Sequence, residues 1–183
     1  MENLFIPIIL GTAREGRRSE VAARYMLTAV EQYGGMTTEL IDVRDCLFAR
    51  TDDTGDSDMA KHYREKIARA DGLIIVSPEY NHGYPGELKL LLDSAFPEYA
   101  HKPVGICGVS IGMMGGGRMM EQLRLIMIEF KMIPLEKAIY FRNVKALFQD
   151  GVITDPSYAE QVKKFLDELV WFARALKTAR QSK

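Results

Sequence analysis

The sequence predicts an α/β fold, a three-layer α-β-α sandwich around a five-stranded parallel sheet. Apolar segments of strand length alternate with segments of helical periodicity along all 183 residues. Residues 72–77 are almost entirely apolar, which is typical of a strand covered on both faces. Strands and helices that alternate are joined by right-handed crossovers, so the strands run parallel and helices cover both faces of the sheet. The chain has no internal repeat or linker, and we expect residues 1–183 to form one domain.

The first two strands are marked by apolar runs and by the residues that interrupt them. Residues 4–10 are expected to form the first strand, with Pro7 where pairing begins, because proline has no N–H group to donate. The helix expected over residues 19–33 carries apolar side chains on one face, and the glycine pair 34–35 ends it. Residues 38–43 are expected to form the second strand.

The middle of the chain begins with a polar segment. Residues 52–58 are turn-forming, and we expect a solvated connection there because their acidic spacing does not match a calcium-binding loop. A helix is expected from about residue 57 to residue 70. The buried strand at 72–77 follows, and then a helix over residues 86–96.

The last part of the chain repeats this alternation. Residues 103–109 are expected to form the fourth strand and residues 115–132 the fourth helix. The apolar stripe of that helix consists of Met119, Leu123, Ile126, Met127 and Phe130. A strand near residues 135–141 comes next, and Asp155 caps a long final helix with Pro156 in its first turn.

The composition excludes several classes of protein. With 24 basic and 25 acidic side chains the net charge is -1, which argues against a nucleic-acid or membrane-surface protein. Cys46 and Cys107 form no CxxC pair and no zinc spacing, so we expect neither a metal site nor a disulfide. Residues 1–10 lack a basic segment and are too short an apolar run for a signal peptide or membrane span. A reducing, cytoplasmic location is expected.

The loop after the first strand has the features of an anion site. Gly11 and Gly16 allow tight turns, and the helix that follows offers free N–H groups and the positive end of its dipole. The polar side chains that could bind a terminal phosphate are Thr12, Arg14, Arg17, Arg18 and Ser19. The alternative is that Ser19 only caps the helix and that the arginines are solvated.

Two other phosphate-binding motifs fit less well. The spacing of Gly11 and Gly16 matches the start of a Walker loop, but Arg17 and Arg18 stand where lysine and a hydroxyl residue should follow. The strand that ends at Ser77 offers no terminal aspartate for magnesium. No G-x-G-x-x-G occurs in the chain. A nucleotide hydrolase is therefore a weakly supported alternative.

The loop after the third strand, Ser-Pro-Glu-Tyr-Asn-His-Gly-Tyr-Pro-Gly at residues 77–86, fits a planar heterocycle. Such a ring needs an apolar or aromatic surface and hydrogen bonds at its edge. Tyr80 could supply the surface, and backbone groups around Glu79, Asn81 and Gly83 the hydrogen bonds.

The loop after the fourth strand, residues 110–118, contains four glycines, which would allow close approach of the backbone to a ligand. Six of the ten methionines lie between Met113 and Met132, and we expect most of them to fill the core. The alternative is that this helix pairs with a second subunit through a surface that includes Met119 or Met120.

Taken together, these segments resemble the NAD(P)H-dependent FMN reductases, a flavodoxin-like family that includes quinone, azo-dye and chromate reductases. The matching segments are Gly-Thr-x-Arg-x-Gly-Arg at 11–17, the loop 77–86 with its continuation through Leu88 to Asp93, and the glycine-rich loop 110–118. They cover most of the chain in the expected order, and the second is the most specific. Relatives commonly have a hydroxyl residue where Arg17 stands.

The resemblance implies a bound FMN whose phosphate contacts the first loop, through Thr12, Arg14, Arg17 and Ser19 together with the neighbouring Arg18. It implies that Pro78, Glu79, Tyr80, Asn81 and Gly83 border the flavin ring, and that Ser110 and Gly112 line its other side. It also implies a homodimer, in some cases assembled into a tetramer.

The activity expected from the resemblance is transfer of hydride from NADPH or NADH through FMN to a small acceptor. Quinones, azo compounds, free flavin and chromate are the expected acceptors. The flavin carries the chemistry, so no side chain is expected to be catalytic, Tyr80 acts by positioning, and His82 is not expected to be essential. The alternatives are a flavodoxin-type electron carrier and a regulatory flavoprotein. Carriers of that type are usually strongly acidic, unlike this nearly neutral chain.

Overall fold

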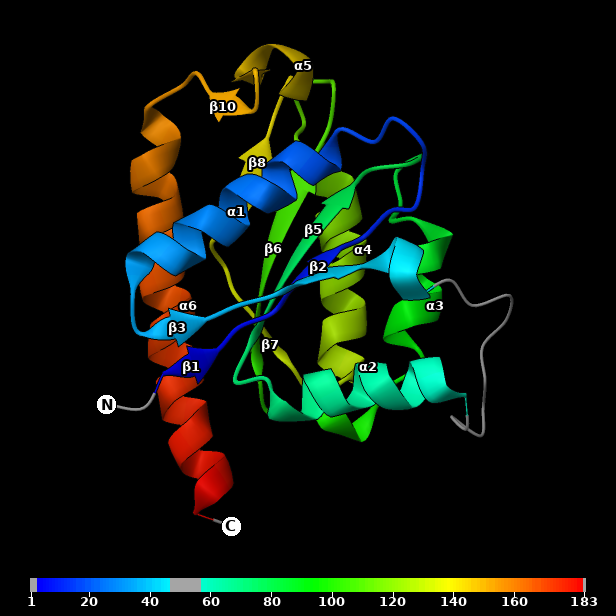
Figure 1. Ribbon diagram of the computed structural model, residues 1–183, viewed down its shortest axis with the longest axis vertical. Helices are drawn as coiled ribbons and strands as arrows, with labels where there is room; N and C mark the ends of the chain where they lie inside the picture. The colour runs from blue at the N-terminus through cyan, green and yellow to red at the C-terminus, as the bar shows by residue number, and fades with distance from the viewer. Residues whose placement is uncertain (1–2, 47–56, 183) are drawn as a thin grey trace.

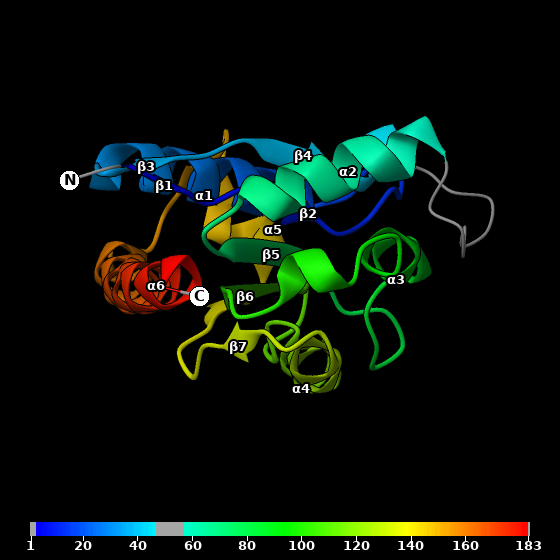
Figure 2. The same ribbon diagram turned by 90° about the horizontal axis from the view of Figure 1, so that it is seen from below.

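The computed structural model describes residues 3–46 and 57–182, which form a parallel sheet with helices on both faces (Figures 1 and 2). The strand order is β4-β2-β5-β6, and two short segments, β7 and β8, both pair with β6. The bounds are Leu40–Asp42 for β4, Ile8–Leu10 for β2, Leu73–Pro78 for β5, Pro103–Val109 for β6, Ile133–Pro134 for β7 and Ile139–Phe141 for β8. Every pairing within this central sheet is parallel, so the predicted fold class is confirmed.

The first predicted strand is divided in two, and the second and fifth predicted strands are shorter than expected, each preceded by an additional two-residue strand. The first consists of β1 (Leu4–Phe5) and β2, because Pro7 between them has no N–H to donate, although its carbonyl accepts from the Ile74 N–H at 3.1 Å. Within the second predicted strand, residues 38–43, the observed strand is β4, which pairs with β2. The short strand β3 (Met36–Thr37), which pairs with β1, precedes that range. Within the fifth predicted strand, near residues 135–141, the observed strand is β8; β7 precedes that range, and both pair with one edge of β6.

Helices α1 (Ser19–Tyr33) and α6 (Ser157–Gln181) cover one face of the sheet (Figure 2). Helices α2 (Asp58–Arg69), α3 (Gly86–Leu92) and α4 (Gly117–Glu129) cover the other. Each face therefore has its own buried apolar core.

The helix boundaries follow from local chemistry. Helix α1 has the predicted bounds and ends at Gly34, where φ is 81°. The Ser57 hydroxyl caps α2, while the expected connection at residues 52–56 lies outside the described residues. Helix α3 stops at Leu92, short of the predicted residue 96. The Asp155 carboxylate accepts from the Ser157 N–H at 2.9 Å, as expected of a cap for α6.

Helix α4 is shorter at both ends than predicted, because residues in the left-handed region bound it. Gly115 and Gly116, with φ of 60° and 85°, precede it, and Lys131, with φ of 56°, follows it. Met119 and Met120 of this helix are buried within the chain, as expected of core methionines, so the alternative in which a subunit interface includes one of them is wrong. The large apolar side chains that α4 exposes are instead Leu125 and Ile128.

A short segment between β8 and α6 was not predicted. It contains α5 (Val144–Leu147) and a hairpin of β9 (Phe148–Gln149) and β10 (Val152–Ile153). Asp150 and Gly151 form the hairpin turn, both with positive φ. Among the described residues, no helix has the length and apolar character needed to cross a membrane.

Candidate functional site

The loops after β2, β5 and β6 meet at the carboxyl end of the sheet, beside the place where the strand order reverses (Figure 1). They enclose a cleft of about 440 Å³, together with the first residues of α5. The cleft is lined by Arg14, Glu15, Gly16, Arg17, Arg18, Ser19, Pro78, Glu79, Tyr80, Val109, Ser110, Ile111, Val144 and Lys145. It therefore combines cationic and aromatic side chains with apolar walls.

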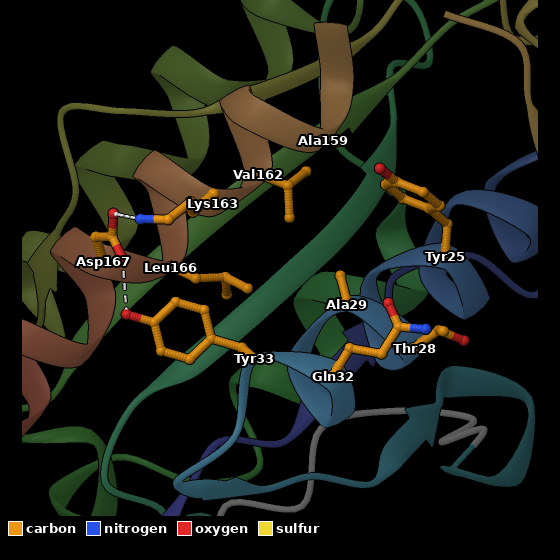
Figure 3. Close-up of a pocket in the computed structure, with 10 residues that line it drawn as sticks. All are labelled: Tyr25, Thr28, Ala29, Gln32, Tyr33, Ala159, Val162, Lys163, Leu166 and Asp167. Carbon is orange, nitrogen blue, oxygen red and sulfur yellow. Dashed lines mark hydrogen bonds and ion pairs between the residues drawn. The ribbon is translucent and has the colours of Figure 1, made fainter. Parts of the chain in front are cut away.

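A larger hollow, about 630 Å³, lies between α1 and α6 (Figure 3). Three of its polar side chains bind one another: the Tyr33 hydroxyl donates to Asp167 at 2.7 Å, and the Lys163 ammonium donates to the same carboxylate at 2.8 Å. It is a groove between two helices and lies away from the carboxyl ends of the strands. We therefore place the functional site in the smaller cleft.

Ser19 distinguishes the first loop from an ordinary helix start. It is the first residue of α1 and is 1% exposed, and its Oγ has no hydrogen-bond partner among the described residues. It therefore makes no capping bond, contrary to the alternative that it only caps the helix. Within the described part of the chain, the backbone N–H groups of residues 15–18 find no acceptor either. A buried hydroxyl and free N–H groups at a helix start fit a phosphate group.

Thr12 lies beneath the loop and ties it to neighbouring segments. Its Oγ1 donates to the Glu87 carboxylate at 3.0 Å and is 2.9 Å from the Tyr80 hydroxyl oxygen. The same carboxylate of Glu87, on α3, accepts from the Ala13 N–H at 2.9 Å. Thr12 is fully buried and does not line the cleft.

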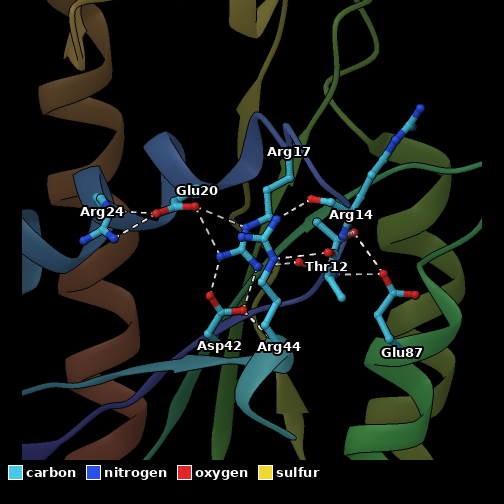
Figure 4. Close-up of polar contacts among 9 residues, drawn as sticks. Thr12, Arg14, Arg17, Glu20, Arg24, Asp42, Arg44 and Glu87 are labelled. Carbon is cyan, nitrogen blue, oxygen red and sulfur yellow. Dashed lines mark hydrogen bonds and ion pairs between the residues drawn. The ribbon is translucent and has the colours of Figure 1, made fainter. Parts of the chain in front are cut away.

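The three arginines of the loop have different surroundings, and Figure 4 labels two of them, Arg14 and Arg17. Arg14 and Arg18 are exposed at the cleft, and the Arg14 guanidinium lies 5.4 Å from the centroid of the Tyr80 ring. Arg17 is directed elsewhere: its guanidinium donates to both carboxylate oxygens of Asp42, which ends β4, and to Glu20. The Arg17 guanidinium is thus bonded to carboxylates of the protein, although part of the residue borders the cleft.

The pairing of Arg17 with Asp42 changes the acidity of both groups. The hydrogen bond and charge of Asp42 raise the pKa of Arg17 against the effect of burial. Burial acts to raise the pKa of Asp42, but the hydrogen bonds and charges of Arg17 and Arg44 outweigh it and hold that pKa below its usual value. Both side chains are therefore charged at neutral pH.

The loop after β5 is a tight turn. Tyr80 and Gly83 exchange two backbone hydrogen bonds of 2.9 Å, and Asn81 and His82 between them have φ of 50° and 70°. The Glu79 carboxylate accepts from the Arg118 N–H at 3.1 Å and so caps the start of α4. Pro78, Glu79 and Tyr80 line the cleft, whereas Asn81 and Gly83 do not.

Glycines allow the loop after β6 to pack closely against the β6 backbone. A Cβ at Gly108 of β6 would lie 2.2 Å from the Gly115 carbonyl oxygen, and one at Gly116 would lie 3.0 Å from the Gly108 Cα. The Ser110 Oγ donates to the Gly112 carbonyl at 2.8 Å. Ser110 lines the cleft and Gly112 does not.

Several residues at the site were not predicted from the sequence. Val144 and Lys145 reach the cleft because Val144 N–H donates to the Ser110 carbonyl at 3.0 Å, which sets the start of α5 beside the loop after β6. Glu87, Asp42 and Arg44 support the first loop from α3 and from the end of β4. For Glu87, its place in the first turn of α3, directly after the loop 77–86, was a usable signal.

Several known proteins are similar to this chain in sequence or in fold. The model of the NADPH-dependent FMN reductase family matches residues 6–146. An NAD(P)H-dependent FMN reductase of Schizosaccharomyces pombe is 30% identical over 90% of this chain and 84% of its own. A quinone reductase of Escherichia coli K12 is 31% identical over 78% of this chain and 79% of its own. The flavoenzyme FerB of Paracoccus denitrificans has a similar fold, with a TM-score of 0.80 and 21% identity over 94% of this chain and 98% of that one.

Proposed function

The chain belongs to the NADPH-dependent FMN reductase family, and from that premise we propose that its cleft binds FMN and that the protein transfers electrons from NADPH or NADH to a small acceptor. A quinone, an azo compound, free flavin and chromate are the acceptor classes we propose. Quinone reductases and an NADPH-azoreductase are among the relatives. The family match favours this activity over that of a flavodoxin-type electron carrier.

The observation that supports the proposal most strongly is the unpartnered, buried hydroxyl of Ser19 at the start of α1. Together with the free N–H groups of residues 15–18, it would hold the FMN phosphate, and Arg14 and Arg18 would add charge-assisted hydrogen bonds. Thr12 would support the loop from below through its bonds to Glu87 and Tyr80.

The remaining walls of the cleft fit a flat ring. When bound, FMN supplies the redox chemistry, accepting hydride from a nicotinamide and passing the electrons on. Pro78, Tyr80 and Ser110 would border the ring, and backbone groups near Glu79, Asn81 and Gly83 would lie at its edge; Gly112 would support Ser110 through its carbonyl. The chain's part in the reaction is therefore to bind, orient and shield.

We also propose that the protein is a homodimer, which could pair further into a tetramer. The outer side of α4 and the neighbouring segment expose Leu125, Ile128 and Phe96, which are 70%, 62% and 48% accessible. Ile111, Met113 and Met114, in the loop after β6, are also exposed. A second copy would cover such an apolar surface. A cytoplasmic location fits the two cysteines, which are free thiols.

The direct test is spectroscopic. We expect the purified protein, supplied with FMN, to retain flavin absorbance after gel filtration, and NADPH or NADH added without oxygen to bleach it. Added quinone should then sustain turnover. A protein that stays colourless and binds no FMN at micromolar concentration would overturn the proposal. Flavin that binds but is bleached by neither nicotinamide would leave an electron carrier as the function.

A further inference from the structure

Three successive carbonyl groups of the first loop are held by two guanidinium groups (Figure 4). Arg17 donates to the Thr12 carbonyl oxygen at 2.6 Å. Arg44, which follows β4, donates to the Ala13 oxygen at 3.1 Å and to the Arg14 oxygen at 2.6 Å. Backbone carbonyls in short exposed loops are usually hydrated, so such a run of side-chain donors is a specific arrangement.

Asp42 connects the two arginines. Its carboxylate accepts from the Arg17 guanidinium through both oxygens, and one of them also accepts from the Arg44 N–H at 3.0 Å. The Arg17 side chain is 4% exposed, which fixes its direction. We call Arg17, Asp42 and Arg44 the carbonyl clamp. It fastens the first loop to the end of β4, the strand beside β2.

The clamp determines where the N–H groups of the loop point. A peptide group is planar and trans, so the N–H of one residue points in the opposite direction to the C=O of the residue before it. With the carbonyls of residues 12–14 drawn toward β4, the N–H groups of residues 13–15 face the opposite side. The Ala13 N–H is on that side, where Glu87 of α3 accepts it. The Glu15 N–H, at the edge of the cleft, finds no acceptor among the described residues.

We propose that the carbonyl clamp is a positioning device that holds the first loop, before any ligand arrives, in the shape that receives the FMN phosphate. The inference rests on the proposed function and deepens it. It gives Arg17 a supporting role in place of a contact with the phosphate, and it adds Asp42 and Arg44 to the residues that determine flavin affinity. A binding loop that is already ordered loses less conformational freedom when its ligand binds.

The clamp concerns the phosphate alone, and this makes it testable with two flavins. Riboflavin has the same ring as FMN and lacks the phosphate. Dissociation constants of both would be measured by fluorescence titration of the flavin-free protein. For Arg44→Ala, which removes an exposed side chain and two hydrogen bonds to the loop, we expect FMN to bind roughly tenfold more weakly and riboflavin to bind within about twofold of wild type.

Arg124→Ala is the matched control. The Arg124 guanidinium also donates to two successive carbonyl groups, those of Leu135 and Glu136, but these lie in the loop after β7. We expect no change in the affinity of either flavin. Asp42→Asn is the second test variant, because it weakens the hold on both arginines with little change in shape, and it should reduce FMN affinity in the same selective way.

The outcomes separate the clamp from the function. Unchanged FMN affinity in both clamp variants, or equal losses of affinity for FMN and riboflavin, would overturn the inference. The proposed function would still hold as long as the wild-type protein binds FMN. Failure of the wild-type protein itself to bind FMN would instead overturn the proposed function. Melting temperatures of the flavin-free variants would identify a general loss of protein stability, which would weaken the binding of both flavins to the same extent.

Discussion

Arg14 combines exposure at the cleft with a fixed aromatic support. Its guanidinium stacks 5.4 Å from the centroid of the Tyr80 ring, so it is held near the proposed phosphate position. A charge-assisted hydrogen bond contributes about 1.5–3 kcal/mol, and Arg14→Ala should therefore weaken FMN binding roughly 10- to 150-fold. Arg69→Ala is the matched control. The Arg69 guanidinium lies 5.5 Å from the centroid of the Phe5 ring, and neither residue lines the cleft. Unchanged FMN affinity in the Arg14 variant would remove that residue from the site.

Tyr80 offers two separable interactions, its ring beneath Arg14 and its hydroxyl at 2.9 Å from the Thr12 Oγ1. We expect Tyr80→Ala to slow the reduction of bound flavin by NADPH roughly tenfold, because the flavin ring and the first loop would both lose the support of the Tyr80 side chain. Tyr80→Phe keeps the ring and should stay near the wild-type rate. Stopped-flow absorbance measures both, and equal rates in wild type and Tyr80→Ala would refute a positioning role.

At the scale of the elements, the loop after β6 depends on the absence of a side chain at Gly108. An added Cβ would lie 2.2 Å from the Gly115 oxygen and 2.6 Å from the Met120 Cε. Overpacking of this kind destabilises by about 1–3 kcal/mol, so Gly108→Ala should lower the melting temperature by roughly 2–12 °C. At Gly86, where a Cβ would have open space, alanine should leave the melting temperature unchanged or slightly higher. An unaffected Gly108→Ala protein would contradict this account of the loop.

The end of α2 is held by a buried lysine. The Lys102 ammonium donates to the Ile67 and Ala68 carbonyls at 2.5 and 2.9 Å. Burial, assisted by the charge of Arg180, lowers its pKa from 10.5 to about 8. Between these values the unfolded chain binds more protons than the folded chain, so the contribution of Lys102 to the free energy of unfolding rises with pH, by about 3 kcal/mol over the whole window.

Comparison with Lys102→Met isolates this contribution. Burial raises the pKa of Cys107, which acts in the opposite direction at alkaline pH, but that thiol is present in both proteins and cancels. The difference in the free energy of unfolding, wild type minus variant, should therefore increase between pH 8 and pH 10. Urea unfolding at several pH values measures it. A difference independent of pH would show that the pKa of Lys102 is not lowered.

The sequence predicted the bounds of helices and strands correctly where the residues that determine them are close together in the chain. The bounds of α1 and β6 agree with those predicted, because glycines and the periodicity of apolar residues mark them. The hairpin that turns at Asp150-Gly151 was missed although that dipeptide favours such a turn, since its strands have only two residues each. The pairing of Arg17 with Asp42 could not be predicted, because the two residues are 25 apart and meet only through the pairing of β2 with β4.

At the scale of the whole molecule, the two cores on opposite faces of the sheet leave the cleft at one end and an apolar strip on the outside of α4. The described residues include no group of three or more acidic, histidine or cysteine side chains placed to hold a metal ion. The proposed binding of FMN concerns the loops and cations that line the cleft, and the proposed association with a second copy concerns the apolar strip.

The proposed homodimer is tested at that strip. Leu125→Glu would place a charge among apolar side chains that a second copy should cover, and burying an unpaired charge is strongly unfavourable. We expect light scattering after gel filtration to give twice the chain mass of 20.7 kDa for wild type and the single mass for this variant. Val152→Glu is the control, because Val152 is 67% exposed, close to the 70% of Leu125, and lies on the separate β10 hairpin. A wild-type protein of single mass would reject the dimer, whereas a variant that remains dimeric would move the interface to another face.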